Sequence, residues 1–100
     1  MFGLIGRITA EAGKREELAQ ILIDGASGMP GCRSYVVALD ATDQDSLWIT
    51  EVWESQEAHQ ASLTLEPVRD AVARGRPLIA GFGERFETAP VGGDGIQEGV

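Results

Sequence analysis

Few side chains in this chain of 100 residues can move a proton near neutral pH. His59 is the single histidine, and histidine is the residue type whose charge ordinarily changes in that range. Glu51 follows Leu47 and Ile49 on one face of a predicted strand, and burial in such an apolar row would raise the pKa of an unpaired carboxyl. Either residue can therefore act as a general base. The alternative for His59 is an exposed position on a helix.

Three further side chains can act on a substrate oxygen. Tyr35 can donate a hydrogen bond, and Arg7 and Arg85 can stabilise an anionic oxygen. Each also has a purely structural interpretation. Tyr35 can be a half-buried strand residue, and the two arginines can form ion pairs with Glu51 or Glu84.

The two tryptophans offer flat surfaces on which an aromatic ring can stack. Trp48 and Trp53 are five positions apart in one predicted strand, so alternation points them to opposite faces. We expect at most one of them to line a pocket and the other to contact a second copy of the chain. Core packing is the alternative for both.

The elements that would position these groups follow from hydrophobic periodicity. Alternation with a period of two predicts four strands, over residues 2–9, 32–39, 47–53 and 78–87. Polar or glycine-rich turns separate them, including a loop over residues 40–45 between the second and third strands.

Helical spacing predicts two helices. The first begins at Arg15, and its core-facing stripe is Leu18, Ile21 and Leu22. The second begins at about Gln56, with Ser55 as a plausible N-cap. Pro67 marks a restart of this helix, because proline is tolerated in a first turn but not in a helix interior.

The order β-α-β-β-α-β predicts an α+β, ferredoxin-like domain with an antiparallel sheet and both helices on one sheet face. Its other face is also largely apolar, and a large exposed apolar patch is unfavourable on a monomer. We therefore expect a homodimer that packs sheet against sheet. The domain spans residues 1–87, and the glycine-rich segment 88–100 is predicted to be a flexible tail.

Composition excludes several function classes. The net charge of −8 disfavours nucleic acid and anionic membranes as partners. No apolar run approaches the roughly 18 residues of a membrane span, and the apolar start reads as a strand, so we expect a cytoplasmic protein. The lone Cys32 permits no intrachain disulfide and is predicted to be a small buried hydrophobe. A single histidine permits no histidine-rich metal site within one chain.

Two short motifs give the chain a family resemblance. A PGC..Y step at Pro30–Tyr35 enters the second strand, and an E.W.S.EA step at Glu51–Ala58 links the third strand to the second helix. In this order and spacing they resemble the antibiotic biosynthesis monooxygenase (ABM) family over roughly residues 1–87.

The resemblance implies a dimeric α/β barrel with a pocket in each subunit between the helices and the sheet. Some members oxidise quinols or aromatic polyketide-like compounds with O₂ and use no metal, flavin or haem. By this resemblance we expect no cofactor, a small aromatic substrate and O₂, with Trp53 against the ring. The candidate catalytic residues are then His59, Glu51 and Tyr35, and Trp48, Arg7 and Arg85 are further candidates for substrate binding.

The chain also departs from its relatives. It contains no asparagine, whereas some of these oxygenases and haem-degrading proteins depend on a pocket asparagine. Residues 70–74 lack the iron-ligating histidine of haem-degrading members, and Ser62 stands where many relatives have a histidine. A non-catalytic ligand-binding or structural dimer is therefore the alternative to a monooxygenase, and haem degradation is the weakest of the three hypotheses.

Overall fold

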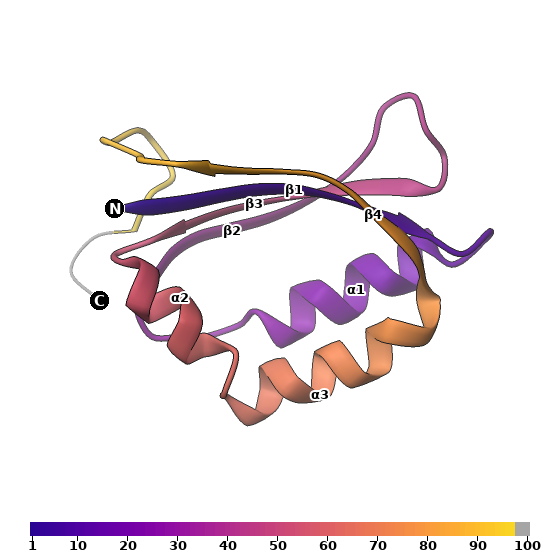
Figure 1. Cartoon of the computed structure of the whole chain (residues 1–100), viewed down its shortest axis with the longest axis horizontal. Helices are drawn as coiled ribbons and strands as arrows, with labels where there is room; N and C mark the ends of the chain where they lie inside the picture. The colour runs from indigo at the N-terminus through magenta and orange to yellow at the C-terminus, as the bar shows by residue number, and fades with distance from the viewer. Residues whose placement is uncertain (98–100) are drawn as a thin grey trace.

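The computed structural model of the chain describes residues 1–97. It contains one antiparallel sheet whose strands lie in the order β2-β3-β1-β4 (Figure 1). The strands are β1 (Phe2–Ala10), β2 (Cys32–Leu39), β3 (Ser46–Trp53) and β4 (Ile79–Thr88). Each lies within about one residue of the range that alternation predicts.

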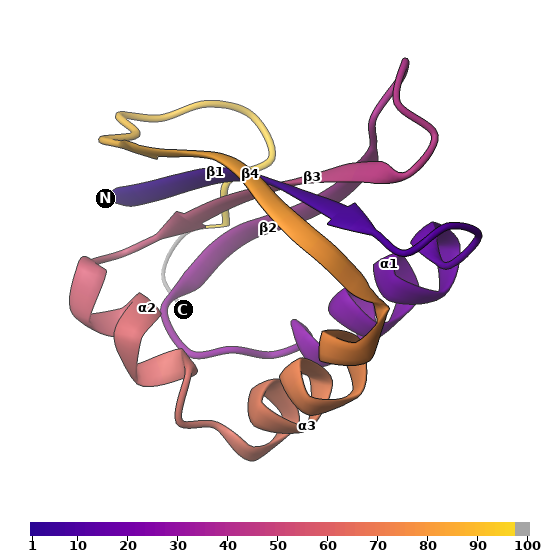
Figure 2. The ribbon, with the colours of Figure 1, turned by 45° about the vertical axis from the view of Figure 1, so that its right-hand side comes forward.

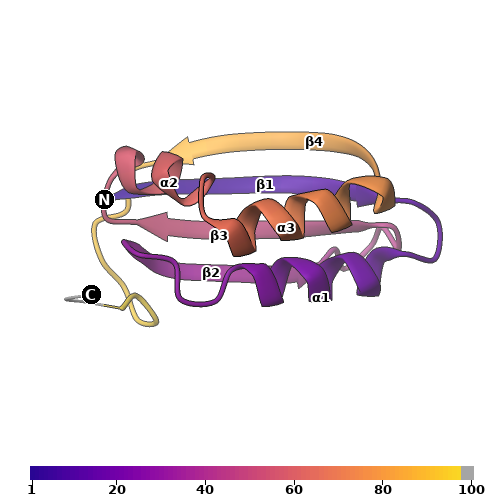
Figure 3. The ribbon, with the colours of Figure 1, turned by 90° about the horizontal axis from the view of Figure 1, so that it is seen from below.

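The helices cover one face of this sheet, which we call the inner face (Figure 3). They are α1 (Arg15–Gly25), α2 (Gln56–Ser62) and α3 (Glu66–Gly75), with a short 3₁₀ turn, η1 (Arg76–Leu78), before β4. The predicted cap is confirmed, because Ser55 Oγ accepts a hydrogen bond from the Ala58 N–H at 3.1 Å. The predicted restart is also confirmed, since Pro67 lies in the first turn of α3.

The main core lies between α1 and the inner face. Leu18 of α1 and Leu47 of β3 are fully buried there, and Ala10, Ala19 and Ile49 complete the cluster. Leu22 packs against this cluster, as the helical stripe predicts. The predicted ferredoxin-like α+β fold is therefore confirmed. Within residues 1–97, no helix has both the length and the apolar character that crossing a bilayer requires.

The edge strand β4 departs from simple alternation. Gly6 of β1 is paired with Arg85, but two residues later Ile8 is paired with Phe82, so β4 contains an extra residue at a bulge. Unbroken alternation over the predicted strand would place Phe82 and Phe86, four residues apart, on one face, and the bulge overturns that expectation. Phe82 lies on the inner face, and Phe86 is paired with Ile5 on the opposite, outer face.

No helix of residues 1–97 covers the outer face (Figure 2). This face exposes apolar side chains. Val36 of β2 and Phe86 of β4 are each 52% exposed on it, and Thr50 and Ile5 lie between them across the paired strands. Val52 lies on the same face, two residues after Thr50. This pattern agrees with the apolar second face that the sequence predicts.

The segment after β4 turns back along the outer side of the molecule (Figure 2). The Pro90 ring lies next to Gly3 of β1, and the Gln97 N–H donates to the Arg33 carbonyl of β2 at 2.9 Å. Residues 89–97 thus cross from the β4 edge to β2. The last three residues of the predicted tail, 98–100, lie outside the described residues.

Cys32 is less buried than the sequence predicts. It is partly exposed at the start of β2, where its Sγ lies 3.6 Å from the Ser34 carbonyl oxygen. Partial burial raises the pKa of its thiol, the contact with Ser34 opposes this effect without cancelling it, and the Glu51 charge adds a smaller upward contribution, so the thiol stays protonated.

Candidate functional site

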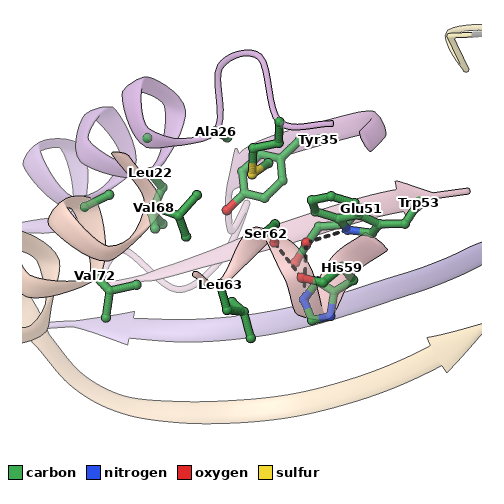
Figure 4. A pocket seen from close by; sticks show the side chains of 13 residues that line it. Leu22, Ala26, Tyr35, Glu51, Trp53, His59, Ser62, Leu63, Val68 and Val72 are labelled. Atoms are coloured by element: carbon green, nitrogen blue, oxygen red, sulfur yellow. Dashed lines mark hydrogen bonds and ion pairs between the residues drawn. The ribbon is translucent and has the colours of Figure 1, made fainter. Parts of the chain in front are cut away.

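A cavity of about 140 Å³ lies between the inner face and the helices (Figure 4). Side chains from α1, α2, α3, β2 and β3 contribute to it, so it forms only when the fold is complete. Most of its lining is apolar, and the polar members are few. The main lining residues are Leu22, Met29, Tyr35, Glu51, Trp53, His59, Ser62, Leu63, Val68 and Val72.

Glu51 provides the carboxylate of this cavity. Alternation along β3 points it toward the helices, and its side chain is only 17% exposed. Its Oε1 accepts a hydrogen bond from the Trp53 Nε1–H at 2.9 Å. His59 Nε2 lies 3.9 Å from the same oxygen (Figure 4). The three side chains therefore form one polar group in an apolar cavity.

Burial is the main influence on Glu51 and raises the pKa of its carboxyl. The hydrogen bond from Trp53, the positive charge that His59 carries when it is protonated, and the charge of Arg85 oppose this effect without cancelling it. A carboxylate with a raised pKa is a better proton acceptor than an exposed one. Burial in the apolar row of β3 thus raises the pKa of the Glu51 carboxyl, as the sequence predicts.

His59 lies in the first turn and a half of α2, close after the Ser55 cap. Its side chain is 16% exposed, so the interpretation as an exposed helical histidine is wrong. The ring meets Trp53 edge-on with centroids 5.4 Å apart, and it lies 5.8 Å from the ring of Phe2. These two aromatic contacts hold the imidazole beside Glu51.

Tyr35 enters the cavity from β2, directly across the ladder from Glu51. Burial, with a smaller contribution from the Glu51 charge, raises the pKa of its hydroxyl. The hydroxyl therefore stays protonated at neutral pH and can donate a hydrogen bond. Figure 4 shows it pointing toward the middle of the lining residues.

The two tryptophans lie on opposite faces, as alternation predicts. Trp53 is 1% exposed and lines the cavity. Trp48 lies on the outer side, where its Nε1–H donates to Asp40 Oδ2 at 2.8 Å. The structure does not bring Trp48 to this cavity. Its hydrogen bond instead ties β3 to Asp40 in the loop between β2 and β3.

The two arginines have different surroundings. Arg7 lies on the outer face, and its Nε donates to Glu84 Oε1 at 2.7 Å, the structural pairing that the sequence allowed. Arg85 is paired with Gly6 on the inner face and contacts Glu87 at 3.2 Å. Within residues 1–97, Glu51 has no arginine at ion-pair distance, although the charge of Arg85 acts on its pKa.

Ser62 is a polar cavity residue that the sequence did not single out as a site residue. It is 4% exposed, and its Oγ donates to the His59 carbonyl at 2.6 Å. Its position three residues after His59 on one helix was the available signal. Phe2, which supports the His59 ring, gave no such signal because it lies far away in the sequence.

Across residues 1–97, no three side chains of histidine, cysteine, aspartate or glutamate are grouped so that they could hold a metal ion.

The fold and the helix–sheet cavity define a small α+β protein with a partly open, mostly apolar cavity between its helices and its sheet. Residues 1–74 match the model of the antibiotic biosynthesis monooxygenase family, and the chain belongs to this family. The match covers both motif steps that suggested the resemblance, and it supports a monooxygenase-like function.

Similarity to solved structures also supports membership of this family. The chain is 59% identical to a candidate antibiotic biosynthesis monooxygenase from Chloroflexus aurantiacus, with a TM-score of 0.93 over 96% of this chain and 98% of that one. A candidate monooxygenase of the same type from Deinococcus radiodurans is 25% identical, with a TM-score of 0.75 over 97% and 99% of the two chains. One from Caulobacter crescentus is 20% identical, with a TM-score of 0.81 over 91% and 90%, and shows the shared fold. No curated protein matches the chain.

Proposed function

We propose that this protein is a cofactor-independent monooxygenase that oxidises a quinol or a polycyclic phenol with O₂. The observation that carries the proposal is the buried Glu51 carboxylate, which lies in an apolar cavity beside His59 and Trp53. Such a cavity can receive a flat aromatic ring and remove its hydroxyl proton. Membership of the family and its candidate monooxygenase relatives support the reaction class.

The proposed reaction needs only the substrate and O₂. The hydroxyl proton passes to Glu51, and the resulting phenolate transfers one electron to O₂. The phenoxyl radical and superoxide combine at a ring carbon that bears hydrogen, and the resulting peroxide anion takes up the proton from Glu51 to give a hydroperoxide. The Glu51 carboxylate then removes that ring hydrogen as a proton while the O–O bond breaks and a carbonyl forms. The departing hydroxide takes up this proton from Glu51 and leaves as water. One oxygen atom enters the product, the other leaves as water, and no external reductant is consumed.

Each side chain has a role in this scheme. Glu51 accepts the hydroxyl proton, and the His59 imidazole beside it stabilises the negative charge that the Glu51 carboxylate carries before this transfer. The Tyr35 hydroxyl donates to a substrate oxygen, and Trp53 supplies a flat wall against the ring. The apolar lining keeps water away from the radical pair. Arg85 adds a positive field from the open side of Glu51.

The active form in this proposal is a homodimer that packs outer face against outer face. Two half-exposed apolar residues, Val36 and Phe86, support this arrangement, because no helix of the described part of the chain covers the face that carries them. The cavity opens on the other side of the sheet, so dimerisation leaves substrate access free.

Oxygen uptake by the metal-stripped protein tests the proposal. The substrates are 1-naphthol, 1,4-dihydroxynaphthalene and an anthrone, and the comparison is a Trp53→Phe, His59→Gln double variant that reports background autoxidation. Trp48→Phe is the matched control, because it makes the same aromatic change on the opposite face of β3. We expect uptake by the wild type and by Trp48→Phe to exceed that of the double variant at least about tenfold, a loss of roughly 1.4 kcal/mol in transition-state stabilisation.

Equal uptake by the wild type and the double variant across the panel would contradict the proposal. If those compounds nevertheless raised the melting temperature of the wild type, the result would favour a dimer that binds ligands without turnover.

A further inference from the structure

A second hollow adjoins the cavity on the far side of Glu51. It has a volume of about 300 Å³ and lies over the paired strands β1 and β4. Glu51 lines both hollows, so this residue stands at their junction. The inner-face residues of the second hollow are Leu4, Gly6, Ile8, Ile49, Phe82 and Arg85.

Gly6 is the unusual residue of this surface. It lies in the interior of β1 on the inner face, between Ile49 of β3 and Arg85 of β4. Glycine weakens a strand interior because it loses more conformational entropy than other residues and offers no side chain to pack. An inner-face position next to the core would ordinarily carry a branched apolar side chain.

Neither backbone conformation nor close packing explains this glycine. Gly6 is not among the glycines with positive φ, so another residue could adopt its conformation. A Cβ added there would meet only the Glu84 carbonyl oxygen, at 3.9 Å. By contrast, a Cβ at Gly3 would collide with the Thr88 side chain, and one at Gly25 would collide with the Ala71 Cβ. Those two glycines are explained by packing, whereas Gly6 borders open space.

The sizes of the two hollows suggest how a ligand would occupy them. A cavity of about 150 Å³ accommodates benzene, so the 140 Å³ cavity beside Trp53 has room for about one ring. Any further ring of a substrate that reaches Glu51 must extend past the carboxylate. Gly6 is paired with Ile49, the inner-face neighbour of Glu51 on β3, and so lies on that path.

We infer that Gly6 is a specificity-determining residue. The hydroxyl-bearing ring of a flat multi-ring phenol reaches Glu51, and the outer rings of the same phenol lie against the backbone of Gly6, which carries no side chain. This inference rests on the proposed function for the identity of the ligand. A side chain at Gly6 would project into the second hollow and leave the cavity beside Trp53 unchanged. It would therefore discriminate against multi-ring compounds and leave single-ring compounds unaffected.

Isothermal titration calorimetry under nitrogen tests this inference, because binding is then measured without oxidation. The probes are hydroquinone, with one ring, and 1,4-dihydroxynaphthalene, with two. The variant is Gly6→Val, since valine suits a strand. Gly81→Val is the matched control: Gly81 is paired with Thr9 in the same sheet, and a Cβ there would meet nothing within 4 Å.

We expect Gly6→Val to weaken binding of the two-ring probe at least about tenfold and binding of hydroquinone by less than about twofold. Gly81→Val should change neither. An equal effect of Gly6→Val on both probes, or no effect on either, would overturn the inference. Failure of the wild type to bind the two-ring probe would also overturn it.

The outcome for the proposed function is separate. Ring-selective binding without oxygen uptake would retain Gly6 as the determinant of ligand size and reject the monooxygenase. Oxygen uptake with a Gly6→Val effect that is independent of ring number would retain the monooxygenase and reject Gly6 as the determinant of ligand size.

Discussion

Glu51 is the residue on which the proposed chemistry depends, and its position is unfavourable for folding alone. An ionised carboxylate that is 17% exposed lacks much of its hydration, and its partners are one indole N–H at 2.9 Å and one imidazole at 3.9 Å. A glutamine would keep the hydrogen bond from Trp53 without the charge. The presence of a carboxylate here therefore points to proton transfer rather than to stability.

The pH dependence of stability tests this interpretation of Glu51. The pKa of its carboxyl is raised in the folded protein, so the folded state binds more protons than the unfolded state between the ordinary and the raised values. Its contribution to stability therefore falls as pH rises through that interval. We expect Glu51→Gln to gain melting temperature relative to the wild type between pH 4 and pH 8 while it loses oxygen uptake.

Glu84→Gln is the matched control for this experiment. Hydrogen bonds from its own backbone N–H and from Arg7 lower the pKa of the exposed Glu84 carboxyl, so Glu84→Gln should change stability with the opposite sign and by a small amount. A Glu51→Gln variant that is less stable than the wild type at pH 8 would show that the carboxylate has a structural role.

At the scale of elements, the short helix α2 determines where His59 lies. Its seven residues give it little intrinsic stability, and its start is fixed by the Ser55 cap. We expect Ser55→Ala to destabilise the protein by about 1 kcal/mol and to reduce oxygen uptake, because the first turn holds His59 against Trp53.

The control for the cap is Ser55→Asp, which restores a side-chain acceptor and should restore both stability and uptake. Denaturant unfolding and oxygen uptake measured on the same samples check the two effects. Full uptake by Ser55→Ala at its reduced stability would show that the position of His59 does not depend on the cap.

The elements themselves could be predicted from the sequence, because period-two and helical spacing report which side chains face the core. Glu51 and Trp53 could be placed on the inner face for the same reason. The bulge in β4 could not be foreseen, because an extra residue in an edge strand leaves no signal in a short alternating run. It separates Phe82 from Phe86 and brings Arg85 to the inner face.

The helical part of the cavity was not predictable in the same way. Leu22, Val68 and Val72 come from α1 and α3, and each reads as an ordinary core position in its own helix. They line a cavity only because the two helices pack together against one face of the sheet. The missing side chain at Gly6 is visible in the sequence, but the open space above it appears only when β4 is in place.

At the scale of the whole molecule, the outer face should form the interface between two copies. We expect the wild type to sediment at twice the mass of the 10.7 kDa chain and Val36→Glu to sediment as a monomer, because a buried unpaired charge opposes association. Ile23→Glu is the matched control, since Ile23 on α1 is 48% exposed and Val36 is 52% exposed. Dimers of Val36→Glu, or monomers of the wild type, would contradict the proposed interface.

The most direct test of the central claim is the fate of oxygen atoms during turnover. Metal-stripped protein is incubated with 1-naphthol under ¹⁸O₂. The quinone product is reduced at once, and its ¹⁸O content is measured by mass spectrometry. The proposed reaction predicts one ¹⁸O atom in the product, formed by the wild type at least about tenfold faster than by the Trp53→Phe, His59→Gln variant. Product whose added oxygen comes from water, or no product above the variant, would contradict cofactor-independent monooxygenation at the Glu51 cavity.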